Sequence, residues 1–305
     1  MFRQTDFLIP AEAPWMFLPE AKMHFVVCIK QVPDSAQIRV HPVTNTIMRQ
    51  GVPTIINPYD LFSLEEALRL RDKVGGEVTV LTMGPPMASD SLRKALTIGA
   101  DRAVLLTDRF FAGSDTLATS YALAQALRKI GEDFGKIDIV FAGKQTIDGD
   151  TAQVGPGIAK RLNMLQLTYV SAITDIDGET GKLLLERRSE GGTQKLQTQM
   201  PCMITMLEGS NVVRRGRIED ALRAARADIV TWSAKEAGIA DLNLCGLKGS
   251  PTVVKKVFAP PPRSYKAAQI ALGATPAESA DAFIDAIFAT APAIEADLTK
   301  LASGF

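Results

Sequence analysis

The chain has 305 residues, of which 46% are hydrophobic and 22% are charged, and its 34 basic and 34 acidic residues leave a formal net charge of zero. This length and apolar content suffice for one large domain with peripheral additions. The balanced charge predicts no nucleic-acid partner, because no global positive field attracts one. No apolar run reaches the roughly 18 residues that a membrane helix needs, so no direct membrane insertion is expected.

The sequence offers few side chains for redox, metal or hydrolytic chemistry. Cys28, Cys202 and Cys245 lie far apart and form no CxxC pair, and the only histidines are His24 and His41. We therefore expect no disulfide framework, iron–sulfur cluster or metal site, and we predict that Cys28 and Cys202 are core residues. No Gly-x-Ser-x-Gly motif is present. We predict no catalytic residue in the chain itself, so any redox chemistry must come from a bound cofactor.

Residues 1–22 precede the first predicted strand. Pro10, Pro14 and Pro19 interrupt their apolar stretches, and Arg3 is the only basic residue ahead of these, which makes a poor signal peptide. We expect a disordered N-terminal extension over 1–22, a natural start at Met23 and a cytoplasmic location.

Strands and helices alternate up to residue 165. Continuous apolar runs predict strands that are covered on both faces, and apolar residues at helical spacing predict helices. The predicted strands are His24–Val32, Val78–Met83, Ala103–Leu106 and Ile137–Ala142. The predicted helices are a segment from Asn57 to Gly75, then Asp90–Ile98, Thr116–Ile130 and Val154–Leu162. Short connections between alternating elements favour an α/β fold with a parallel sheet and right-handed crossovers.

The pattern changes after residue 165. Strand-like runs separated by turns predict an antiparallel addition, formed by Leu167–Ile173, Leu183–Arg188, Gln194–Thr198 and Cys202–Leu207. The alternation in Ile38–Met48 predicts a hairpin-like excursion, and Ile218–Arg226 predicts a short helix.

The last part of the chain is rich in loops and proline. A terminal helix is predicted from Thr275-Pro276, with an apolar stripe that either folds back on the chain or, as we favour, grips a partner. The stripe consists of Phe283, Ile284, Ile287 and Phe288. We predict an α/β nucleotide-binding domain over 23–233 and a C-terminal arm over 234–305.

The most informative segment runs from Gly143 to Pro156, between a predicted strand and a predicted helix. A loop rich in glycine and hydroxyl groups at this place lets backbone N–H groups approach phosphate, and the new helix directs its free N–H groups at the ligand. Lys144 could neutralise phosphate charge, and Asp148 or Asp150 could accept from a ribose. The alternative is an ordinary βα loop, in which the two aspartates make a turn and an N-cap and Lys144 is a solvated lysine.

Several motifs in fixed order resemble the beta subunit of electron-transfer flavoproteins. They are Val26-Val27-Cys28-Ile29-Lys30-Gln31-Val32-Pro33, Asn57-Pro58-Tyr59-Asp60, Met83-Gly84-Pro85, Gly99-Ala100-Asp101-Arg102 and the loop that begins at Gly143. The resemblance covers nearly all of residues 24–262 and implies a Rossmann-like, HUP-type domain that binds an adenine nucleotide. The pocket that it implies is formed by Cys28, Asn57, Pro58, Tyr59, Asp60, Met83, Ala142, Gly143, Lys144, Gln145, Thr146, Asp148, Gly149, Asp150, Thr151 and Gln153.

A second resemblance narrows the first to the electron-bifurcating branch, and within it to the Fix-type subunit associated with nitrogen fixation. It rests on the segment Phe111–Thr119 and on Gly246–Thr252. By it, a whole FAD occupies the pocket, and Gly113, Ser114, Thr116 and Thr119 hold its pyrophosphate. The alternatives are AMP in a conventional subunit, or a simple Ser/Asp N-cap without a ligand at this position. Asp115 could also satisfy the helix end while Thr116, Thr119 and the backbone bind.

The resemblance also implies partners. An alpha subunit completes a heterodimer, NADH is the donor, and the acceptors are a ferredoxin or flavodoxin and a quinone oxidoreductase with its ferredoxin-like protein. Such partners could associate the complex with a membrane, and nitrogenase could receive the electrons. A nucleotide-binding stress or sensor protein on a similar sheet is a further alternative.

One segment departs from the conventional family pattern. Where ordinary members carry Asn-Glu-Pro-Arg-Tyr in the partner-recognition loop, this chain has Asn211-Val212-Val213-Arg214-Arg215-Gly216-Arg217. We predict that Arg214, Arg215 and Arg217 dock an acidic partner by charge steering. A solvated basic loop is the alternative.

Overall fold

The computed structural model describes residues 22–34, 39–40, 47–48, 53–253, 267–271 and 273–303. The chain divides into two compact units, Met1–Phe258 and Ala259–Phe305. The predicted N-terminal extension lies outside the described residues except for Lys22, and so do Pro260, Pro261 and Pro262.

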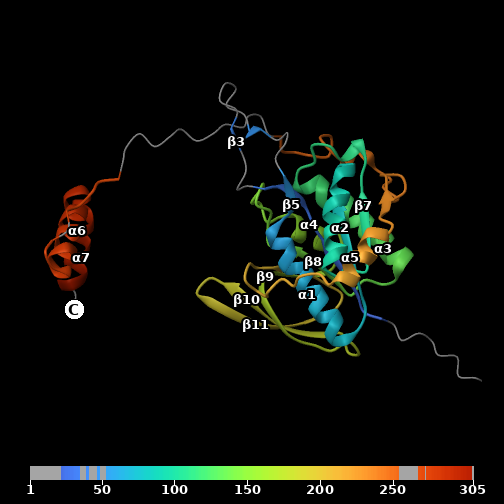
Figure 1. Ribbon diagram of the computed structural model, residues 1–305, viewed down its shortest axis with the longest axis horizontal. Coiled ribbons are helices and arrows are strands. Elements are labelled where there is room, and N and C mark those ends of the chain that lie inside the picture. Colours follow the sequence, from blue (N-terminus) through green and yellow to red (C-terminus); the bar gives the residue numbers. More distant parts are fainter. Residues whose placement is uncertain are drawn as a thin grey trace, which may run out of the picture. The chain divides into compact units, whose positions relative to one another are not determined.

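The first unit is built on a nine-stranded sheet with the order β11-β10-β9-β12-β8-β1-β6-β7-β13 (Figure 1). Its strands are β1 (His24–Cys28), β6 (Glu77–Met83), β7 (Arg102–Leu106), β8 (Ile139–Gly143), β9 (Leu165–Ile176), β10 (Lys182–Ser189), β11 (Gly192–Gln199), β12 (Cys202–Met206) and β13 (Val230–Trp232). Seven neighbouring strands run parallel, in the order β9-β12-β8-β1-β6-β7-β13. The two strands at the other end, β10 and β11, are antiparallel to their neighbours. The predicted α/β fold with a parallel sheet and an antiparallel addition is therefore confirmed.

Helices cover both faces of this sheet. They are α1 (Pro58–Val74), α2 (Ser89–Ile98), α3 (Thr116–Phe134), α4 (Val154–Leu162) and α5 (Ile218–Arg226). Alternate residues of the fully buried β1 point to opposite sides: Phe25 packs in the core that contains α1 and α2, and Val26 packs in the core that contains α3 and α4. The continuous apolar runs of the central strands reflect this burial on both faces.

The order of the strands reverses between β1 and β8. The chain passes from β1 to β6 and β7 on one side and then crosses to β8 on the other side of β1. In parallel α/β sheets, ligands bind at the carboxyl ends of the strands at such a switch point. The loop that follows β8 starts there.

The antiparallel part is smaller than expected, because β9 and β12 belong to the parallel sheet. All five residues of β12 are buried, and the strand lies between β8 and β9. The hairpin of β10 and β11 forms the open end of the sheet (Figure 1). The sequence pattern did not distinguish β12 from the antiparallel strands β10 and β11, because a short apolar run does not show whether a strand is parallel or antiparallel to its neighbours.

Short elements complete the first unit. Two small antiparallel pairs join β2 (Gln31–Pro33) to β5 (Thr54–Ile56) and β3 (Arg39–Val40) to β4 (Ile47–Met48), and the second pair is the predicted hairpin. The 3-10 helices among the described residues are η2 (Pro86–Ala88), η3 (Arg109–Phe111) and η4 (Leu242–Leu244).

Residues 234–253 pack against the α/β unit. Ala234, Ala237, Ile239 and Cys245 are buried in the core that contains α3 and α4. Cys28 and Cys202 are buried as predicted.

The second unit contains α6 (Pro276–Thr290) and α7 (Pro292–Ser303), which contact each other. Thr275 and Glu278 form a capping box at the start of α6, at the predicted position. The sequence did not predict α7 as a separate helix. No helix in the described part of the chain combines the length and the hydropathy that crossing a bilayer requires.

Candidate functional site

The loop between β8 and α4 has a strained and well-defined backbone. Asp150 and Ala152 have φ angles of 54° and 55°, which residues with a side chain seldom adopt. Asp150 N–H donates to the carbonyl oxygen of Thr146 at 2.9 Å, and Gln145 Nε2 donates to Asp150 Oδ1 at 2.8 Å. Backbone strain of this kind clusters at ligand sites, where the surroundings must hold it in place.

Two buried side chains at the start of α1 support this loop. Asp60 accepts the N–H of Lys30 at 2.7 Å and the N–H of Gly143 at 3.0 Å, so it joins the ends of β1 and β8. Asn57 stands at the N-cap position but makes no side-chain cap. Its Nδ2 donates to Gln145 O at 2.9 Å instead, and its Oδ1 accepts from Ile147 N at 3.2 Å.

Burial sets the protonation of the groups under the loop. It raises the pKa of the Asp60 carboxyl to about 7, although the N–H groups of Lys30 and Gly143 act in the opposite direction. Burial, with a smaller contribution from Asp60, raises the pKa of the Cys28 thiol to about 12. Cys28 is therefore a neutral thiol at the carboxyl end of β1.

Two charged side chains of the loop, Asp148 and Lys144, pair with residues just beyond the ends of neighbouring strands. Lys30 Nζ lies 2.8 Å from Asp148 Oδ1, just beyond β1. Lys144 Nζ lies 3.0 Å from Glu208 Oε2 and 4.9 Å from the centre of the Tyr59 ring. A phosphate that recruits Lys144 must therefore compete with Glu208.

Glu208 also links the loop to the antiparallel hairpin. Its second oxygen lies 3.2 Å from Arg188 Nη2. Desolvation alone would raise its pKa, but the hydrogen bonds from Lys144 and Arg188 lower the pKa to about 2. Glu208 is thus ionised at neutral pH, and it holds Lys144 at the edge of the sheet.

The start of α4 lacks a side-chain cap. Gln153 occupies the N-cap position without a capping hydrogen bond, and its Oε1 accepts from Thr116 Oγ1 at 2.9 Å. An added Cβ at Gly155 would lie 2.7 Å from Thr205 Cγ2, so glycine permits the close approach of α4 to β12. An uncapped helix N-terminus at the switch point fits an anionic group such as a nucleotide phosphate.

The start of α3 is capped by the chain itself. Asp115 Oδ1 accepts from Leu117 N at 2.9 Å and from Ala118 N at 3.0 Å. Its other oxygen accepts both the N–H and the hydroxyl of Thr252. The end of α3 is therefore satisfied largely by Asp115, so Thr116, Thr119 and the backbone remain as the predicted groups for a pyrophosphate.

The two segments that resemble the bifurcating branch lie side by side. Gly246 N donates to Ser114 Oγ at 3.1 Å, and Asp115 N donates to Ser250 Oγ at 2.8 Å. An added Cβ at Gly113 would lie 2.7 Å from the Leu247 side chain. Segments that are more than 130 residues apart in sequence thus form one junction.

The structure gathers most of the predicted site residues at one edge of the sheet. Cys28, Met83, Ala142 and Gly143 end strands, Asn57, Pro58, Tyr59 and Asp60 begin α1, and Lys144, Gln145, Thr146, Asp148, Gly149, Asp150, Thr151 and Gln153 form the loop. Gly113, Ser114, Thr116 and Thr119 lie at the start of α3, which the Thr116–Gln153 hydrogen bond connects to the loop.

Two residues of this edge were not predicted, Lys30 and Glu208. Lys30 lies two residues beyond the end of β1, so the rule that ligands lie at the carboxyl ends of parallel strands could have found it. Glu208 follows β12 at the same edge, but it was missed because β12 was assigned to the antiparallel addition.

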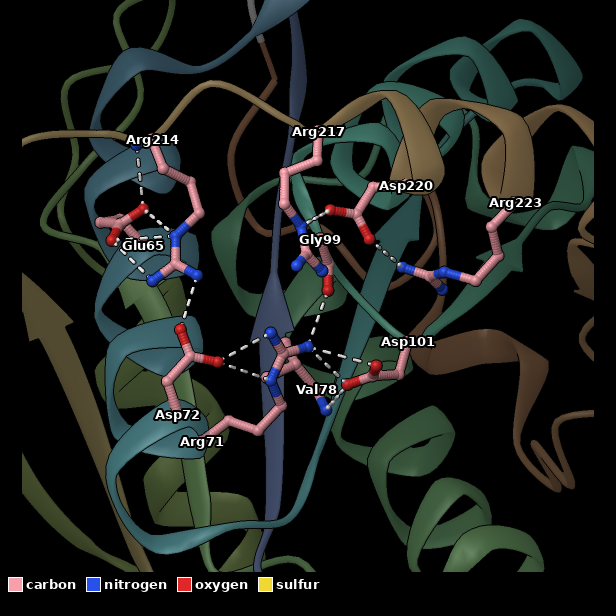
Figure 2. A network of polar contacts seen from close by, with 10 residues as sticks. All are labelled: Glu65, Arg71, Asp72, Val78, Gly99, Asp101, Arg214, Arg217, Asp220 and Arg223. Carbon is pink, nitrogen blue, oxygen red and sulfur yellow. Dashed lines mark hydrogen bonds and ion pairs between the residues drawn. The ribbon is translucent and has the colours of Figure 1, made fainter.

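The predicted partner-recognition arginines differ in their surroundings. Figure 2 shows Arg214 clamped between Glu65 and Asp72 of α1, with Nε–Oε2 and Nη1–Oδ2 distances of 2.9 and 2.7 Å. The hydrogen bonds that Arg214 donates to Glu65 and Asp72 raise its pKa despite its partial burial. Arg217 pairs with Asp220 at 3.1 Å in a separate chain of contacts (Figure 2).

Arg215 is exposed, and no ion pair involves it among the described residues. The side chain of Arg217 is 77% exposed. Arg214 therefore holds its loop to α1, whereas Arg215 and Arg217 face solvent.

Comparison with known proteins agrees with this geometry. Residues 44–237 match the electron transfer flavoprotein domain. The chain is 71% identical over 283 residues to Protein FixA of Azorhizobium caulinodans, covering 93% of this chain and 100% of that protein. It is 62% identical over 281 residues to Protein FixA of Azotobacter vinelandii, covering 92% and 100% of the two chains.

A conventional name occurs among more distant relatives. The electron transfer flavoprotein subunit beta of Clostridium acetobutylicum is 49% identical over 234 residues, which cover 77% of this chain and 87% of that protein. The chain belongs to the electron transfer flavoprotein family, as a beta-type subunit of the Fix type that acts in electron transfer.

Proposed function

We propose that this chain is the beta subunit of a heterodimer with an electron transfer flavoprotein alpha subunit, and that it binds the adenine nucleotide of FAD where the sheet changes direction. The observation that carries the proposal is the uncapped start of α4 behind a strained loop. Free N–H groups and the helix dipole favour a phosphate there. Membership of the family leaves the stress or sensor alternative without support.

The residues at this edge suit separate parts of the ligand. The N-terminus of α4 and Thr151 would receive phosphate, and Asp148 or Asp150 would accept from ribose hydroxyls. Lys144 would reach the phosphate by exchanging its contact with Glu208. The half-buried Met83 and the neutral Cys28 would border the adenine.

The choice of FAD over AMP rests on similarity to FixA proteins and on the junction of Phe111–Thr119 with Gly246–Thr252. Because Asp115 satisfies the end of α3, a pyrophosphate there would depend on the backbone of Gly113 and on the hydroxyl groups of Thr116 and Thr119. Because Asp115 already caps α3, the cap also favours the alternative function, a conventional subunit that binds AMP.

A bound FAD would supply the hydride and single-electron chemistry that the side chains lack. We propose NADH as the donor, and a ferredoxin or flavodoxin and a quinone oxidoreductase with its ferredoxin-like protein as the two acceptors. Supply of electrons to nitrogenase and a cytoplasmic complex that reaches the membrane through partners complete the proposal. The chain binds, orients and shields the cofactor.

The stoichiometry of cofactors tests the proposal. The chain is co-expressed with its alpha subunit, the purified heterodimer is denatured, and the released FAD and AMP are quantified by chromatography. Two FAD per heterodimer support bifurcation, whereas one FAD and one AMP support the conventional alternative. A colourless complex without any adenine compound would exclude both.

We also propose that Arg215 and Arg217 steer an acidic acceptor protein, because they face solvent and Arg214 does not. Replacing both with serine should slow reduction of the acceptor several-fold at low salt and abolish most of its salt dependence. Lys235→Ser, which removes an exposed charge elsewhere, should leave the rate unchanged. An unchanged low-salt rate in the double variant would contradict steering.

A further inference from the structure

Asn57 and Asp60 lie underneath the loop after β8, where a ligand on its outer side cannot reach them. Their exposed fractions are 0% and 4%. Both polar atoms of the Asn57 side chain and both oxygens of Asp60 already bond to the chain. A residue of the binding region that is buried and fully paired acts on a ligand only through the atoms that it holds.

The atoms that these side chains hold are spaced along the loop. Asp60 accepts the N–H of Gly143. Asn57 donates to the carbonyl oxygen of Gln145 and accepts the N–H of Ile147, so every second residue is hydrogen-bonded to the start of α1. Lys144 N donates in the other direction to Met206 O at 3.0 Å. These contacts therefore hold Gly143 at the end of β8 and Lys144, Gln145 and Ile147 of the loop, ahead of the turn that carries the strained residues.

The packing at Gly143 shows how close this support is. A Cβ there would lie 2.6 Å from Asp60 Oδ1 and 2.6 Å from Tyr59 Cβ. Only glycine lets the loop settle onto the first turn of α1. Because the N–H of Lys30 shares the Asp60 carboxylate, the end of β1 and the loop are held by one group.

We propose that Asn57 and Asp60 are positioning residues, which hold the loop in its nucleotide-binding conformation before the ligand arrives and do not touch the ligand. The inference rests on the proposed function. The inference deepens the proposed function, because the free-energy cost of ordering the loop is met when the chain folds. Nucleotide binding then does not have to supply this free energy. In the Asn57-Pro58-Tyr59-Asp60 motif, the first and last residues would therefore support the nucleotide-binding loop from the side that faces away from the ligand.

The test compares Asp60→Asn with a matched control, Asp138→Asn. Asp60 accepts the N–H of Lys30 just beyond the carboxyl end of β1, and Asp138 likewise accepts a backbone N–H, from His24 at the opposite end of that strand, at 2.9 Å. Asparagine keeps the shape of each side chain and removes one acceptor. Asn57→Ser serves as a second variant if Asp60→Asn does not fold.

Two quantities are measured on the full-length chain in its heterodimer with the alpha subunit, after the bound nucleotide has been removed. Hydrogen–deuterium exchange of a peptide covering 143–150 is followed without nucleotide and with saturating AMP, and AMP and FAD affinities are measured by titration calorimetry. We expect Asp60→Asn to speed exchange of this peptide about tenfold, to weaken both affinities about tenfold, and to regain protection when AMP is saturating. Asp138→Asn should change neither quantity.

The outcomes separate the two proposals. If the wild-type chain binds AMP or FAD and Asp60→Asn binds equally well, the positioning role is overturned, whatever happens to the exchange rate. Equal losses of affinity in Asp60→Asn and Asp138→Asn would also overturn it, because general destabilisation would explain them. If the wild-type heterodimer rebinds neither nucleotide while its loop is protected from exchange, the proposed function itself fails and the positioning role fails with it.

Discussion

Helices α3 and α4 both begin at the carboxyl edge of the parallel sheet, yet their first turns are completed in different ways. At α3, Asp115 accepts the N–H groups of Leu117 and Ala118. At α4, Gln153 stands in the same position and caps nothing. The chain has closed one helix end with its own carboxylate and has left the neighbouring end available to an anion.

The capped N-terminus of α3 also holds a neighbouring segment of the chain in place. Through Asp115 and Ser250, the start of α3 fastens the segment around Thr252, which follows the buried Cys245. A ligand could not replace these contacts without releasing that segment. The open end of α4 carries no such segment and lies beside the strained Asp150 and Ala152. The difference teaches that equivalent helix ends at one sheet edge need not be equivalent sites.

Removing the closed cap should produce the largest effect on stability. Asp115→Ala leaves two helix N–H groups without a partner and frees Thr252, so we expect the free energy of unfolding to fall by about 2 kcal/mol. Nucleotide content should stay the same, because Asp115 is a cap and not a ligand. Urea unfolding and cofactor extraction measure the two quantities. A loss of nucleotide at unchanged stability would mean that α3 is the phosphate site.

Adding a cap to the open end should act in the opposite direction. Gln153→Asp places a carboxylate where α4 starts, which should stabilise the nucleotide-free chain by roughly 0.5 kcal/mol and weaken AMP binding about tenfold, since the carboxylate occupies the N–H groups and repels phosphate. Gln153→Asn is the matched control, because it can cap without charge and should weaken AMP binding less. Unchanged affinity in both variants would show that the N-terminus of α4 does not bind phosphate.

Much of the parallel sheet could be predicted because its strands and helices carry distinct periodicities. The start and end of α4 agree with the prediction, and so do both ends of α5. The direction of β12 could not be predicted, since a five-residue apolar run is compatible with a parallel or an antiparallel partner. Glu208 was missed as a consequence, because its place at the site follows from the direction of β12.

The candidate site was predictable in location and less so in roles. Residue type and order brought Asn57 and Asp60 to the site, but burial decides that they support the loop, and burial depends on tertiary packing. In the same way, three neighbouring arginines look alike in the sequence. Only the position of Glu65 and Asp72 on α1, more than 140 residues away, distinguishes Arg214 from Arg215 and Arg217.

The smallest expected effect is a difference in acid sensitivity between the two helix ends. Burial would raise the pKa of Asp115, but hydrogen bonds from Ala118, Thr252 and Leu117 outweigh it and hold the pKa below its ordinary value. A lowered pKa means that the cap contributes its full stability above about pH 4 and loses it as the pH falls further.

We therefore expect wild type and Asp115→Asn, which caps without charge, to differ by less than about 1 kcal/mol at pH 7 and to converge below pH 4. The wild-type α4 end has no titrating cap, so Gln153→Asn should show no such convergence with wild type. Gln153→Asp should acquire it. Urea unfolding of the four proteins at several pH values between 3 and 7 measures these differences. A convergence of Gln153→Asn with wild type would mean that a titrating group other than Asp115 acts at the start of α4, and the contrast between a closed and an open helix end would not hold.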